Sequence, residues 1–103
     1  LEKRDRLRAW LSKKGFAHGY VTIDASDWAI EARLVKRLRQ VPTADLSPYR
    51  DFYLAHMWER AQYYHALAQK VWGRPVRHTI LIHHNLLSAL FLGDLIDHFQ
   101  ARY

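Results

Sequence analysis

VTIDASDW, residues 21–28, is a β-rich run that turns polar at its end. Residues 20–23 have the composition of a buried strand, but Asp24, Asp27 and Trp28 follow at once. Two carboxylates and a tryptophan are poor material for a hydrophobic core. In parallel α/β architectures, polar side chains at the carboxyl end of a strand, where a loop leads into a helix, are typical of a functional site.

A second stretch, HTILIHHN at residues 78–85, is likewise an apolar run that ends in polar residues. Its nearly continuous apolar run is typical of a parallel strand buried on both faces, and it ends in His83, His84 and Asn85. The carboxyl ends of neighbouring parallel strands lie at the same edge of a sheet, so we expect Asp27 and His83 to lie close together. A carboxylate beside an imidazole orients the ring and favours its protonated form, which suits a general acid.

Helical periodicity surrounds both strands. Gly15 and Gly73 are expected helix ends, Ser47-Pro48 is a helix start, and Asn85 is a cap. The predicted helices are Glu2–Lys14, Trp28–Leu38, Tyr49–Trp72 and Leu86–Arg102. The order α-β-α-α-β-α predicts an α/β fold with two parallel strands and about four helices. Because two strands alone do not make a stable sheet of this kind, we expect the chain to be part of a larger α/β unit.

Composition limits the classes of protein to which the chain can belong. The 103 residues are enough for one unit, residues 1–103, and half of them are hydrophobic, which excludes wholesale disorder. No run approaches the ~18 apolar residues of a membrane span, and the absence of cysteine excludes disulfides and thiolate metal sites. The sequence begins on Leu1 without Met, as expected of a segment from a longer protein. The net charge of +6 is concentrated in two groups of basic residues, within 3–14 and 33–39.

DASDW (24–28) followed by TILIHHN (79–85) resembles the last two motifs of the polysaccharide deacetylase family. These carbohydrate esterases, which share the NodB-homology domain, remove acetyl groups from N-acetylated polysaccharides such as chitin and peptidoglycan. The resemblance implies a distorted (β/α) barrel, of which this chain would be the C-terminal part. It implies that His83 is the catalytic acid, that Asp27 orients and charges it, and that Trp28 and Leu81 form an apolar wall against the acetyl methyl group.

The resemblance also implies a divalent metal, usually zinc, which upstream motifs hold. The same upstream motifs carry the base that activates water. Those motifs are absent from this sequence, so we expect this chain alone to bind no catalytic metal and to be inactive. The missing N-terminal part of the barrel would supply both. This sequence departs from the family in having His84 where an Asp is usual, and in the inserted aromatic helix of residues 48–72.

Alternative interpretations stay open. Asp27 could be a helix N-cap and Asp24 a turn former, while His84 and the five histidines outside the motif are interpreted as structural. The aromatic helix could be a core element or a platform for sugars. The two basic groups could be solvated helix faces or the phosphate contacts of a nucleic-acid-binding module, although no reading helix, zinc finger or RNA-binding aromatic motif is present. A non-catalytic assembly fragment is a third possibility, and open strand edges would favour self-association.

Overall fold

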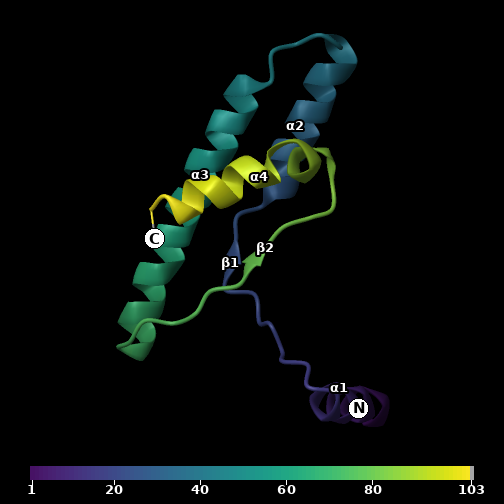
Figure 1. The fold of residues 1–103 in the computed structure, drawn as a ribbon, viewed down its shortest axis with the longest axis vertical. Helices are drawn as coiled ribbons and strands as arrows, with labels where there is room; N and C mark the ends of the chain where they lie inside the picture. The colour runs from purple at the N-terminus through teal and green to yellow at the C-terminus, as the bar shows by residue number, and fades with distance from the viewer. Residues whose placement is uncertain (103) are drawn as a thin grey trace.

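The computed structural model describes residues 1–102 and is built mainly from helices (Figure 1). Two of them, α2 and α3, run side by side, and α4 crosses them. A short parallel strand pair lies beside this helical body, against α3. In chain order the elements are α1 (Glu2–Lys13), β1 (Ile23–Asp24), α2 (Asp27–Gln40), α3 (Ser47–Trp72), β2 (Ile80–Leu81) and α4 (Leu86–Gln100).

The predicted fold class was wrong. The chain is 66% helical with two strands of two residues each, so it is a mostly helical protein and not the C-terminal part of an α/β barrel. Each strand has only the other as a neighbour, and nothing extends the ladder on either side within residues 1–102. Tyr20 and Val21, predicted to be in a buried strand, are 68% and 50% exposed. Their β propensity is not expressed because it depends on packing against neighbouring strands.

The core lies between helices. Its residues recur at helical spacing, Ile30 and Leu34 on α2 and Tyr53 and Met57 on α3, so that each helix turns one stripe inward. Helix α4 adds Leu87 and Leu95, two turns apart on one face. The loop after β1 adds only Ala25. Helix-on-helix packing therefore holds the fold together, and the strand pair is attached to it.

Local signals placed the ends of the helices well. Gly73 ends α3 with a φ of 65°, and the Asn85 side chain accepts a 2.9 Å hydrogen bond from the Ser88 N–H at the start of α4, as predicted. Ser47 was expected to cap α3, but it is the first helical residue. Asp45 accepts bonds from the Ser47 N–H (3.0 Å) and hydroxyl (2.8 Å) instead. A carboxylate is the stronger acceptor, and the positive end of a helix dipole favours it.

Helix α1 lies apart from the body, at the far end of an extended segment (Figure 1). It has the predicted basic face, but no residue of α1 is buried, and its apolar Leu7 and Trp10 are 58% and 53% exposed. The helix therefore forms without packing against the core. None of the helices in residues 1–102 has the length and apolar character needed to span a membrane.

Candidate functional site

The strand pair brings the two sequence motifs together. Strands β1 and β2 are parallel, with Ile23 opposite Ile80 and Asp24 opposite Leu81, so both carboxyl ends lie at one edge. Asp27 follows β1 by three residues and His83 follows β2 by two. Asp27 and His83 lie in contact, as expected, although each strand is only two residues long.

Asp27 holds His83 through both carboxylate oxygens. The His83 Nδ1–H donates to Asp27 Oδ1 at 2.6 Å, and the His83 backbone N–H donates to Oδ2 at 2.9 Å. The side chain of Asp27 is 1% exposed, whereas that of His83 is 48% exposed. The carboxylate therefore fixes the tautomer and orientation of the ring, and leaves Nε2 as the nitrogen available to a ligand.

The turn before α2 explains why Asp27 points toward β2. Ser26 has left-handed backbone angles (φ 53°, ψ 47°), which cost a residue other than glycine roughly 1–2 kcal/mol. Its N–H donates to Asp24 Oδ1 at 3.0 Å, so Asp24 forms the turn, as the alternative interpretation proposed. Ser26 is the N-cap residue, without a side-chain bond, and Asp27 is the first residue of α2. Asp27 is therefore not the N-cap, and its carboxylate is committed to His83.

The other predicted residues flank this pair. Trp28 directly follows Asp27 and is 60% exposed, so its indole is available to a binding partner. Leu81 is half-buried and lies two residues before His83, at the ladder position opposite Asp24. His84 is exposed. The structure thus joins Asp27 to His83 by direct contact, with one exposed and one half-buried apolar side chain next to them in sequence.

Tyr53 is a neighbour of Asp27 that the sequence did not identify. The side chain is fully buried, and its hydroxyl has no hydrogen-bond partner within the described residues. Burial, with a further contribution from the negative charge of Asp27, raises the pKa of Tyr53 to about 12. The nearby Ser88 hydroxyl lowers the pKa of Tyr53 in part, although its geometry does not make a hydrogen bond to the phenol. A neutral phenol therefore lies beside the buried carboxylate and keeps water from it.

The start of α4 is tied to the same site. Glu31, one turn after Asp27 on α2, accepts a 2.8 Å bond from the Leu87 N–H, and the Ser88 hydroxyl donates to the His83 carbonyl at 2.7 Å. The first bond satisfies a first-turn N–H of α4, and the second fixes the backbone at His83. The spacing of four residues between Asp27 and Glu31, which places both on one helix face, was the available signal.

The residues of this chain do not fit a zinc ion by themselves. Across residues 1–102 there is no group of three or more histidine, cysteine or carboxylate side chains that could hold a metal. The chemical groups that the structure brings together are Asp27 and His83.

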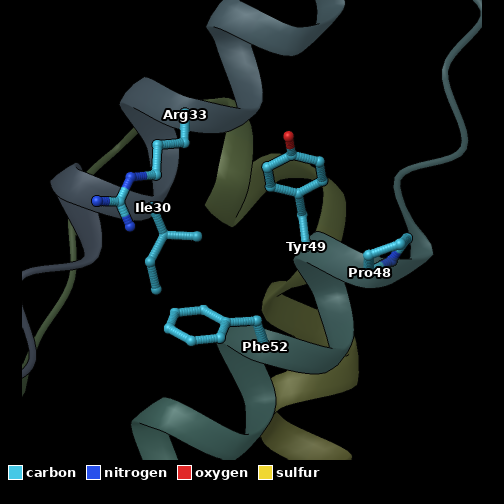
Figure 2. Close-up of a pocket in the computed structure, with 5 residues that line it drawn as sticks. All are labelled: Ile30, Arg33, Pro48, Tyr49 and Phe52. Atoms are coloured by element: carbon cyan, nitrogen blue, oxygen red, sulfur yellow. The ribbon is translucent and has the colours of Figure 1, made fainter.

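A separate hollow of about 190 Å³ lies between α2 and the start of α3. Figure 2 shows Ile30 and Phe52 pointing toward one another across it, with Tyr49 and Pro48 beyond. Arg33 is the one charged side chain in its lining. None of the predicted site residues lines this hollow, so we assign it no part in the chemistry.

Comparisons with protein-family models, with curated proteins and with solved structures give no match for this chain. The resemblance carried by residues 24–28 and 79–85 therefore rests on those motifs alone. Any assignment of function depends on the motifs together with the geometry of Asp27 and His83.

Proposed function

We propose that this chain carries the catalytic-acid part of a metal-dependent carbohydrate de-N-acetylase that acts on an N-acetylated polysaccharide. The observation that supports it is the 2.6 Å bond between a buried carboxylate and a half-exposed imidazole. A merely structural ion pair needs neither the exposed ring nor the free Nε2 atom. An acid that must reach a substrate needs both.

The reaction requires a proton at one defined point. When an amide is hydrolysed, the carbon–nitrogen bond breaks readily only if the departing nitrogen is protonated, because an amine anion is a very poor leaving group. His83 in its imidazolium form would donate the Nε2 proton to that nitrogen as the bond breaks. The carboxylate of Asp27, bonded to Nδ1, keeps the ring aimed and leaves Nε2 as the atom from which the proton departs.

The remaining parts of the reaction belong to other groups. Trp28 and Leu81 supply apolar surface for the acetyl methyl group, as the resemblance implies. In this proposal, the metal ligands and the base that activates water come from residues of the complete protein outside this sequence. Those residues would hold the metal, which would lower the pKa of a bound water and polarise the acetyl carbonyl.

The test uses protein made from the complete reading frame that encodes this chain. Acetate release from chitin oligosaccharides is measured for wild type, His83→Ala and the matched control His84→Ala, with zinc content determined for each. We expect His83→Ala to lower kcat by about 10²–10⁴-fold, the usual contribution of general acid–base catalysis, at unchanged zinc content. His84→Ala should stay near wild type, because His84 makes no contact with the Asp27 carboxylate.

Full activity in His83→Ala would contradict the proposal, and so would the absence of acetate release from every N-acetylated polymer tested. Salt-sensitive binding of DNA or RNA that His83→Ala leaves unchanged would instead favour the nucleic-acid-binding alternative.

A further inference from the structure

A polar hollow of about 370 Å³ lies where β1 ends and faces α3. Its volume falls within the ~300–1,000 Å³ typical of ligand pockets. We refer to it as the Asp24–Arg60 hollow. One wall is the turn that begins α2, and the other is one face of α3. It is lined by Asp24, Ala25, Ser26, His56, Arg60 and Tyr64.

The α3 wall is a stripe of polar and aromatic residues four positions apart, namely His56, Arg60 and Tyr64. His56 Nε2–H donates to the Ala25 carbonyl at 2.8 Å, which fixes the helix against the turn. Its ring also stacks on Phe52, with centroids 5.6 Å apart. These contacts hold the α3 wall against the turn, and because His56 Nε2 is used in one of them, Arg60 and Tyr64 are the polar side chains of this wall that remain for a ligand.

Arg60 is held in position but not neutralised. Its guanidinium lies 4.6 Å from the ring centroid of Tyr63 and 5.0 Å from that of Tyr64, and it donates to the Tyr64 hydroxyl at 3.3 Å. Within residues 1–102 it forms no ion pair with a carboxylate. Stacking on two rings orients a planar cation while leaving donors for a ligand.

Asp24 places the opposite charge in the same hollow. One of its oxygens accepts from the Ser26 N–H, and the side chain is otherwise exposed. It is not paired with Arg60. The two opposite charges offset one another for a ligand of either sign, so charge selects neither an anion nor a cation. A neutral ligand with many hydroxyl groups can donate to the carboxylate and accept from the guanidinium, while Tyr64 offers an aromatic surface.

The hollow and the acid pair share one turn. Asp24 lines the hollow and Asp27 holds His83, and between them lies Ser26, the one residue other than glycine with a positive φ in residues 1–102. Strained backbone of this kind is concentrated at functional sites. The turn therefore connects the lining of the hollow, through Ser26, directly to Asp27, whose carboxylate holds the proton donor.

We infer that the Asp24–Arg60 hollow binds a neutral sugar residue of the polysaccharide, next to the residue that loses its acetyl group. The inference rests on the proposed function for the identity of the polymer. Asp24 and Arg60 bind hydroxyl groups there, Tyr64 contacts the sugar ring, and none of the three takes part in proton transfer.

The test compares chitin oligosaccharides of two to five residues with protein from the complete reading frame. Asp24→Asn and Arg60→Ala should each raise KM about 10-fold for the pentamer, the usual effect of losing a hydrogen bond to a charged group, with kcat near wild type. The dimer, too short to fill the hollow, should show little change. Arg102→Ala is the matched control, because Arg102 also lies over an aromatic ring, that of Trp58 at 5.8 Å, but outside the hollow.

Binding of the pentamer, measured by calorimetry on the His83→Ala background, separates this inference from the proposed function. If no acetate is released but the pentamer binds and Arg60→Ala weakens that binding, the subsite stands and the deacetylase assignment fails. If acetate is released and the pentamer KM is the same in Asp24→Asn, Arg60→Ala and Arg102→Ala, the subsite is wrong. Equal rises in KM for dimer and pentamer would also overturn it.

Discussion

Asp27 is the residue on which the site depends. A buried carboxylate is costly unless its oxygens are hydrogen-bonded, and both oxygens of Asp27 are bonded to His83. The neighbouring Tyr53 is buried without a bond of its own, so the wall beside the carboxylate excludes water and contributes no donor within the described residues. This arrangement strengthens the Asp27–His83 bond, because electrostatic interactions are stronger where water is excluded.

The raised pKa of Tyr53 makes stability depend on alkaline pH. In the unfolded chain the phenol loses its proton near pH 10, whereas the native one keeps it until about 12. The native state then binds more protons, so the free energy of unfolding falls as pH rises through this range. Two pKa units correspond to roughly 1–3 kcal/mol, and Tyr53→Phe should remove that part of the pH dependence.

Urea unfolding between pH 9 and 12 measures this effect, and the difference in phenolate absorbance between wild type and Tyr53→Phe isolates the titration of Tyr53 from that of the other five tyrosines. Tyr63→Phe, at an exposed position of α3, is the matched control. A Tyr53→Phe variant that loses stability with pH as steeply as wild type would refute the assignment of this dependence to Tyr53.

At the scale of elements, the beginning of α4 connects the scaffold to the site. Asn85 caps the helix, Glu31 of α2 accepts from its first turn, and Ser88 of that turn donates to the His83 carbonyl. The same few bonds therefore satisfy the helix terminus and fix the backbone of the proposed acid. The α4 terminus acts as a structural support for His83.

Asn85→Ala should lower the free energy of unfolding by about 1 kcal/mol, because one first-turn N–H loses its acceptor. Asn85→Asp keeps an acceptor oxygen at the same place and should retain most of the stability. Urea unfolding followed by circular dichroism gives both values. If alanine and aspartate prove equally stable, the cap contributes nothing measurable.

At the scale of the whole molecule, the chain is a helical body with one appended helix. Helices α2, α3 and α4 share one core, whereas α1 buries no residue and is connected by the extended segment of residues 16–22. Helical packing sets the position of the strand pair, and the strand pair then sets the distance between Asp27 and His83.

Removal of residues 1–14 should therefore change the free energy of unfolding by less than about 0.5 kcal/mol, as for other changes outside packed contacts. Urea unfolding of the shortened chain, followed by circular dichroism at 222 nm, is the measurement. A loss above about 1 kcal/mol would mean that α1 packs against the body in solution. Leu7→Ser and Trp10→Ser in the intact chain then identify the contact.

Sequence patterns predicted what depends on neighbours along the chain. Local patterns predicted the glycine that ends α3, the Asn85 cap and the polar residues at the strand ends. The parallel direction of the strands then predicted that Asp27 and His83 lie together. The fold class was not predictable in this way. Residues 20–22 have strand composition, but a stable sheet needs three or more strands or packing on a helix, and within residues 1–102 the ladder has only the two short strands β1 and β2.

Side chains on α3 were the harder part of the site. Aromatic residues occur around this helix, so no apolar stripe distinguishes buried Tyr53 from exposed Phe52 and Tyr63. His56 and Arg60 have no metal-ligand or catalytic spacing in the sequence. They are identified as lining a hollow only once α3 packs against the turn at Asp24. Rotation of a helix about its axis is set by tertiary packing, which a weakly patterned helix does not encode locally.

The 56 residues that separate Asp27 from His83 have a consequence for folding. Bringing such distant residues together costs loop-closure entropy, which local helix formation does not require. The packing of α2 against α4 joins segments about as far apart in the chain, so the same closure serves the helical core and the Asp27–His83 bond. A chain in which α4 has not docked on α2 would keep most of its local helix but hold a carboxylate and an imidazole that have not met. Formation of the proton donor is thus tied to closure of the core.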